Sequence, residues 1–295
     1  MKKSSTDHTK GVSALILLAF LGSLMGVFAR YLYTFFSVFQ QIYLRFAFAS
    51  LFGFLIFWKY ISFAKIKKIS PREWLIIGVR SFSYSVAAAL WVQAVNSAKY
   101  ANAMFIDSIP LAAVWGMILF KEKMTAKKAF YLILAIFGVM VLAVKDYSNL
   151  LIWGKGEVMM FLATVLFAFR NVTRKWHSKL LNNQEISQLN LLITCLMLFV
   201  ISLILNEGSV SLSSLNWQVF VMLGMGALTL LFIVFLTNYG FDKIEAILAS
   251  NIGTLGAVFG VLIGFIVYRE VPTVKELLGG AIIVTSIIQM NRLKS

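Results

Sequence analysis

Residues 112–127 read AAVWGMILFKEKMTAK, and residues 260–275 read GVLIGFIVYREVPTVK. Aligning the two stretches places Glu122 on Glu270 and Thr125 on Thr273. A chance match between two apolar helices would repeat Leu and Val, whereas a shared Glu and Thr at one helix-turn-helix corner indicates an internal duplication. The sequence therefore predicts two copies of one unit, residues 1–148 and residues 149–295. Both glutamates are expected to stabilise the N-termini of the helices that follow them.

The composition places the chain in a membrane. Of its 295 residues, 60% are hydrophobic and 13% are charged, and the mean hydropathy is +0.85. Soluble domains are about 45–50% apolar and about 25% charged. These departures indicate a polytopic membrane protein and exclude a disordered chain and a disulfide-rich secreted scaffold.

Apolar runs long enough to cross a bilayer recur along the whole chain, since a crossing helix needs about 20 apolar residues. The ten-residue alternation typical of a transmembrane barrel is absent. The sequence predicts an all-α integral membrane protein of ten transmembrane helices, five in each copy. The expected spans are 11–30, 38–58, 74–96, 101–120, 128–145, 156–178, 186–205, 217–239, 245–268 and 272–291.

The basic residues indicate the orientation of these spans. If the N-terminus is cytoplasmic, 19 of the 27 Lys and Arg residues fall on inner segments and six on outer ones. This asymmetry follows the positive-inside rule and predicts that both termini are cytoplasmic. We interpret the net charge of +15 as this topology signal. A nucleic-acid partner is not expected, because a nucleic-acid binder would gather its basic residues on one soluble face.

Five helices per copy is an odd number, so the second copy must lie upside down relative to the first. Inverted repeats are typical of secondary transporters, whose substrate site lies near the bilayer midplane between the two repeats.

A known family shares several of these features. The chain resembles the drug/metabolite transporter superfamily, specifically its bacterial ten-helix EamA-type members, over essentially its whole length. The resemblance implies a multi-pass protein of the bacterial inner membrane with no cofactor. It further implies alternating access to a central cavity lined mainly by helices one, three, four, six, eight and nine. The residues that carry it are Arg45, Pro110, Leu119, Phe120, Lys121, Glu122, Thr125 and Gly138 in the first copy, and Tyr268, Arg269, Glu270, Thr273 and Gly279 in the second.

The second copy departs from the first near the centre of the membrane. Pro110 falls on Val258, and Asp107 falls on Leu255. A kink in helix four therefore need not be mirrored in helix nine, and the gating motion need not be symmetric.

Two charged residues, Arg45 and Asp107, are expected at similar depth, on the order of 10 Å below the outer surface at about 1.5 Å per helical residue. A charge within the bilayer costs roughly 2.5–3.5 kcal/mol, so it normally faces a cavity or a partner. The two residues form either a pair that fixes helix packing or a pair that breaks when substrate or a proton binds to Asp107. Pro110, one turn later, frees a backbone carbonyl that a substrate could use.

Two further arginines, Arg80 and Arg170, are expected at similar depth from the inner surface. They either extend to the inner headgroups or form a basic cavity that binds a carboxylate or phosphate through paired hydrogen bonds. Helix three carries more polar side chains around Arg80 than a lipid-facing helix would, and one side of it is expected to line the cavity. The candidate residues on helix three are Ser81, Tyr84, Ser85 and Trp91.

Glycines at four-residue spacing occur on helices one and nine. Such small residues let helices approach closely, for static packing or for gating by one helix sliding past another. They are Gly22 and Gly26 on helix one, and Gly256, Gly260 and Gly264 on helix nine.

The favoured function is secondary-active transport of a small metabolite, namely an amino acid or another anionic or zwitterionic compound. The alternative is a proton-coupled exporter of neutral or cationic amphipathic compounds that uses Asp107. An integral-membrane transferase is a remote third reading. With 12 acidic residues, two histidines and no Asp-rich motif, neither a metal site nor an enzyme is expected. The expected partners are the lipid bilayer, a small-molecule substrate and a coupling ion or counter-substrate.

Overall fold

The structure is a computed structural model that describes residues 5–98, 100–144, 154–208, 210, 216–269 and 271–293. The expected boundary between residues 148 and 149, and Glu270, lie outside the described residues. Within the described ranges the regular elements are helices, and no strand occurs. They are α1 (Ser5–Tyr33), α2 (Val38–Phe57), η1 (Trp58–Tyr60), α3 (Phe63–Ile66), α4 (Pro71–Ser97), α5 (Tyr100–Asp107), α6 (Leu111–Phe120), α7 (Ala126–Ala143), α8 (Lys155–Val172), η3 (Thr173–Trp176), α9 (Asn183–Ile204), α10 (Trp217–Lys243), α11 (Ala246–Gly253), α12 (Leu255–Tyr268) and α13 (Val274–Arg292).

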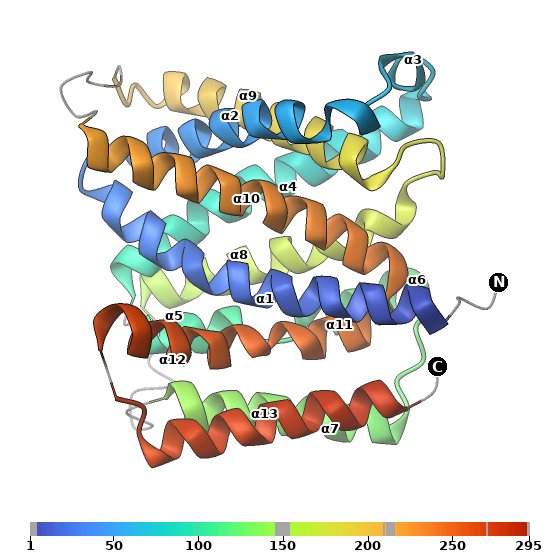
Figure 1. Cartoon of the computed structure of the whole chain (residues 1–295), viewed down its shortest axis with the longest axis vertical. Coiled ribbons are helices and arrows are strands. Elements are labelled where there is room, and N and C mark those ends of the chain that lie inside the picture. Colours follow the sequence, from blue (N-terminus) through green and yellow to red (C-terminus); the bar gives the residue numbers. More distant parts are fainter. Residues whose placement is uncertain are drawn as a thin grey trace.

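The predicted all-α membrane fold is confirmed. Eight described helical stretches are long and apolar enough to cross a membrane, and Phe105–Phe120 is a shorter apolar stretch. The ten expected spans correspond in order to α1, α2, α4, α5 with α6, α7, α8, α9, α10, α11 with α12, and α13. These helices lie roughly side by side in one bundle (Figure 1).

The repeated corner contains a helix cap in each copy. The hydroxyl of Thr125 accepts a hydrogen bond from the backbone N–H of Lys128 at the start of α7, at 3.3 Å. The hydroxyl of Thr273 accepts one from the N–H of Glu276 at the start of α13, also at 3.3 Å. Threonine recurs at this position because its side chain satisfies an N–H group that the helix itself leaves unpaired.

Helices four and nine are both interrupted, although helix nine has no proline at the position that matches Pro110. The first break lies between Asp107 and Leu111, where Pro110 supplies no backbone N–H. The second lies at Thr254, whose hydroxyl donates to the carbonyl of Asn251 at 2.7 Å. A threonine hydroxyl that bonds to a nearby backbone carbonyl can disturb a helix without proline.

The start of α1 and the end of α13 lie at the same end of the bundle (Figure 1), where His8 Nε2 is 2.9 Å from Asn291 Oδ1. We call this the terminal end, and the other the opposite end. From the terminal end α1 runs to the opposite end, whereas α8 starts at the opposite end and runs back (Figure 1). The copies are therefore inverted relative to one another.

The last helix of each copy packs against the other, as α7 and α13 lie together at one edge of the bundle (Figure 1). Gly138 and Gly279 allow this contact. A Cβ on Gly279 would lie 2.7 Å from the carbonyl oxygen of Gly138, closer than two such atoms can approach. These two glycines of the family pattern thus serve the packing of one repeat on the other.

Candidate functional site

A cavity of about 1050 Å³ lies between the two repeats. Small-molecule sites typically measure about 300–1,000 Å³, so this cavity can accommodate a metabolite. Its walls come from α1, α4, α5, α6, α8, α10, α11 and α12, as the family resemblance implies, and also from α2 and the ends of α7 and α13.

The cavity extends toward the opposite end of the bundle. Its lining there includes Val144, Val271 and Thr273, which lie in the connections that follow α7 and α12. Val271 is 79% exposed. Toward the terminal end the lining reaches Leu15 of α1 and Phe241 in the last turn of α10, and it includes no residue of the connections that follow. The structure therefore has a cavity reached from the end away from the termini.

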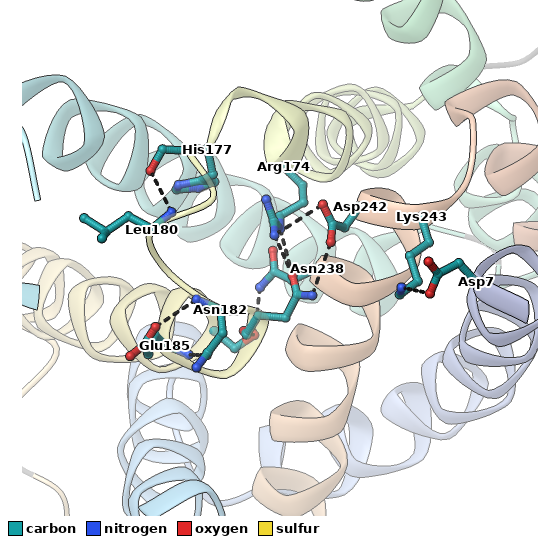
Figure 2. A network of polar contacts seen from close by, with 12 residues as sticks. Asp7, Arg174, His177, Leu180, Asn182, Glu185, Asn238, Asp242 and Lys243 are labelled. Carbon is teal, nitrogen blue, oxygen red and sulfur yellow. Dashed lines mark hydrogen bonds and ion pairs between the residues drawn. The ribbon is translucent and has the colours of Figure 1, made fainter. Parts of the chain in front are cut away.

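Ion pairs join elements at the terminal end, beyond the cavity. Figure 2 shows Arg174 of η3 reaching Asp242 of α10, with Nη2 and Oδ1 3.5 Å apart. The same view shows Lys243 of α10 paired with Asp7 of α1. These contacts join α1 and η3 to the end of α10.

Two buried arginines and a tyrosine lie together in the cavity wall. Arg170 and Arg45 both line the cavity, and they are only 2% and 3% exposed. The guanidinium carbon of Arg170 lies 4.3 Å from the ring centroid of Tyr84, a cation–π geometry. Arg45 also interacts electrostatically with Tyr84. One arginine comes from each repeat, with the tyrosine close to both.

Both guanidinium groups have donors that the described protein atoms leave unused. Arg170 Nη1 donates to Asn171 Oδ1 at 3.1 Å, and Arg45 Nε donates to the carbonyl of Gln41 at 3.2 Å. Arg170 Nε, Arg170 Nη2 and Arg45 Nη1 have no partner among the described residues. A buried donor without a partner is costly, so these three donors mark a part of the cavity wall that lacks hydrogen-bond acceptors.

Asp107 also lines the cavity, at the C-terminal end of α5, together with Trp91 and Pro110. Its side chain is hydrogen-bonded to the side chains of Trp91 and Thr164. The expected pair with Arg45 does not form: no ion pair joins these two residues in the described chain. The reason is that Arg45 turns toward Gln41 and Tyr84, whereas Asp107 faces α4 and α8.

Arg80 does not line the cavity, which corrects the expectation of a basic site built from Arg80 with Arg170. It is fully buried near the terminal end, so it does not extend to the headgroups either. Its guanidinium group lies 2.7 Å from His177 Nε2, and donates to Asn238 Oδ1 at 2.6 Å and to the carbonyl of Arg170 at 3.1 Å. The other imidazole nitrogen of His177 is 2.7 Å from a Glu73 oxygen.

These contacts perturb the proton affinity of His177. Burial, followed by the nearby positive charges of Arg80 and Arg174, lowers the pKa of His177 to about 2. The imidazole is therefore neutral at physiological pH. The imidazole connects the buried guanidinium group of Arg80 to the buried carboxylate of Glu73, and so it holds the end of α8 against α4. Sequence reasoning missed this group, because Glu73 lies 104 residues from His177 and no local pattern joins them.

Ser81 and Ser85 do not line the cavity, which also differs from the expectation. Both are fully buried. Ser81 donates to Asn190 of α9 at 3.3 Å, and Ser85 donates to the carbonyl of Ser81 at 2.9 Å. Of the polar face expected on helix three, Tyr84 and Trp91 line the cavity.

The glycines of helices one and nine line the cavity instead of packing tightly. A Cβ on Gly22 or Gly260 would meet no atom within 4 Å, and one on Gly256 would lie 3.9 Å from the carbonyl of Ala19. Gly26 and Gly264 belong to the same lining. The expectation of close helix contact is therefore not met at Gly22 and Gly260 in this conformation, because the open cavity separates the helices there.

Several lining residues were not anticipated from the sequence. They are hydroxyl-bearing side chains within apolar helices, namely Thr164, Thr237 and Ser250. A single polar residue in an apolar stretch is the only feature of the sequence that points to them.

The inverted ten-helix bundle with a central cavity defines a class of membrane transport proteins. The EamA-like transporter family matches residues 9–144 and again residues 154–292. The chain belongs to this family, and it is a multi-pass membrane transporter of small molecules. A solved structure described as "Crystal structure of protein" is similar in fold, with a TM-score of 0.74, 16% sequence identity and 98% of each chain covered. Among curated proteins, no sequence matches this chain.

Proposed function

We propose that this protein is a secondary-active transporter that carries a small anionic or zwitterionic metabolite, such as an amino acid, by alternating access. The observation that carries the proposal is the presence of two buried arginines with unused donors, Arg45 and Arg170, in the wall of one cavity. Guanidinium groups bind carboxylate and phosphate in a planar, paired geometry.

The membrane and orientation follow from the charge distribution. We place the protein in the bacterial inner membrane with both termini in the cytoplasm. The excess of Lys and Arg on alternate connections supports this orientation, and so does the shared end at which His8 and Asn291 meet. In this orientation the cavity opens away from the cytoplasm.

The first experiment is a thermal-shift measurement on the purified protein with amino acids, phosphorylated sugars, nucleotides and cationic amphipaths. A ligand at a hundred times its dissociation constant stabilises the folded state by about 2.7 kcal/mol. We expect stabilisation by a compound that carries a carboxylate or phosphate, and loss of that stabilisation in Arg170→Gln. Stabilisation by cationic compounds alone, unchanged in the variant, would reject the anion site.

A second candidate is a proton-coupled exporter of neutral or cationic amphipathic compounds that uses Asp107. Asp107 lines the cavity beside Trp91 and Thr164, and a carboxyl group in the cavity wall is the group that would take up and release a coupling proton. This candidate predicts that Asp107→Asn abolishes transport driven by a pH gradient but retains exchange of substrate across a membrane without one.

A further inference from the structure

At the terminal end of the bundle, the two repeats also meet at the end of α6. Lys121 adopts the left-handed conformation with φ of 52°. The N–H of Glu122 donates to the carbonyl of Gly116 at 3.2 Å. This turn ends α6 and directs the Glu122 side chain toward α11 of the other repeat.

The carboxylate of Glu122 occupies the N-terminus of α11. One oxygen accepts the backbone N–H of Ala246 at 2.9 Å, and the other accepts the N–H of Ile247 at 3.1 Å. Lys175 of η3 forms an ion pair with the first oxygen. A carboxylate at this position satisfies N–H groups that the helix leaves unpaired and is favoured by the helix dipole.

The expected role of Glu122 was different. It was expected to stabilise the following helix, α7, but Thr125 caps that helix. The three groups bound by Glu122 all belong to the second repeat, whereas Glu122 belongs to the first.

The backbones of α6 and α11 lie in close contact at this point. A Cβ on Gly116 would lie 2.7 Å from the Cβ of Ala246. The N–H of Ala113 donates to the hydroxyl of Ser250 at 3.3 Å. These two helices are the terminal-end halves of the interrupted helices four and nine, and they meet between the cavity and the terminal end.

We propose that Glu122 is a gating residue that holds the terminal end closed, and that it must release α11 and Lys175 before the cavity can open toward the termini. The inference rests on the proposed alternating access. Because Ala113 is fully buried and does not line the cavity, a reagent can reach it only if α6 separates from α11.

Burial distinguishes Glu122 from Asp242, an acidic residue at the same end. The side chain of Glu122 is 8% exposed, whereas the side chain of Asp242, which pairs with Arg174, is 42% exposed. Ion pairs exposed to water contribute little, whereas a buried charged hydrogen bond contributes more. Asp242→Asn is therefore a matched control for Glu122→Gln.

The test uses the full-length protein with Cys195→Ser and Ala113→Cys, and measures the rate at which a water-soluble maleimide labels the new thiol. This rate is proportional to the population of the open form. We expect Glu122→Gln to raise the rate about tenfold or more, since a tenfold change corresponds to about 1.4 kcal/mol. Lys175→Gln should also raise the labelling rate, and Asp242→Asn should change the rate by less than about twofold.

An unchanged rate in folded Glu122→Gln, or an equal rise in Asp242→Asn, would overturn the proposal. If Glu122→Gln does not fold, the Lys175→Gln rate decides, and an unchanged rate there rejects the gate. No substrate is present in the measurement. A failure of the gate is thus distinguishable from a failure of the anion site, which the thermal-shift experiment tests separately.

Discussion

Arg170 and Tyr84 come from different repeats and meet in the cavity wall, where the guanidinium carbon lies 4.3 Å from the ring centroid. The tyrosine covers one face of the guanidinium group, and Nε and Nη2 are left without a partner among the described atoms. The contact with Tyr84 thus holds the guanidinium group of Arg170 in position before any ligand binds.

The first prediction separates charge from geometry at Arg170. Arg170→Gln should weaken binding of the stabilising anion by about ten- to hundredfold, because hydrogen bonds to charged groups contribute about 1.5–3 kcal/mol. Arg170→Lys keeps the charge but lacks the planar, paired donors, so its loss should be smaller and still measurable. Isothermal titration with the anion found by thermal shift checks both variants. Equal affinity in all three proteins would place the anion elsewhere.

The second prediction concerns the open space beside Gly260. Leucine there fits the present conformation, since a Cβ would meet no atom within 4 Å. It should raise the free energy of unfolding by up to about 1 kcal/mol through helix propensity. If α1 and α12 must approach to close the opposite end, the same side chain should abolish transport. Uptake of the substrate into proteoliposomes measures the loss of transport.

Gly224→Leu is the control for this substitution. A Cβ on Gly224 also meets no atom within 4 Å, but Gly224 lies in a shallow groove between α2 and α10, away from the central cavity. Normal uptake by Gly260→Leu would show that the opposite end closes without contact at that position.

The third prediction concerns pH. The pKa of His177 is about 2 in the folded protein and about 6.5 in an unfolded chain. Below pH 6.5 the unfolded state therefore binds a proton that the folded state does not, so stability falls as the pH falls. The slope is at most about 1.4 kcal/mol per pH unit, and stability is insensitive to this group above pH 6.5.

His177→Gln should remove this part of the pH dependence between pH 6 and pH 4. It should also lower stability at pH 7, because Glu73 and Arg80 lose a shared partner. His8→Gln, at the terminal end, is the control and should retain the slope. The dependence of stability on pH is measured by thermal unfolding at several pH values, with circular dichroism as the signal. An unaltered slope in His177→Gln would mean that another group causes the acid sensitivity.

The fourth prediction tests the contact between repeats. Gly279→Ala should lower the free energy of unfolding by about 1–3 kcal/mol, because the new methyl group meets backbone atoms of α7 that cannot move aside. Gly280→Ala is a matched control one residue away, where a Cβ would lie 3.8 Å from its nearest neighbour. A melting temperature equally affected in both variants would contradict the proposed packing role of Gly279.

The sequence alone was sufficient for the ten spans, the duplication and its inversion. These depend on local properties: the length of each apolar run, the count of helices per copy and the recurrence of Thr125 as Thr273 at one corner. The hydrophobic effect and the positive-inside rule act on such properties wherever they occur in the chain. The structure agrees with these predictions because no distant contact is needed to satisfy them.

Only the tertiary structure decided the role of each buried polar residue. Arg80 and Arg170 looked equivalent by depth, yet one binds His177 and Asn238, 97 and 158 residues away, and the other lines the cavity. A buried polar group must be satisfied by whichever partner packing brings close, and that partner has no fixed spacing in the sequence. Thr125 and Glu122 differ for the same reason. The capping role of Thr125 follows from its position in the sequence, whereas the carboxylate of Glu122 binds a helix of the other repeat.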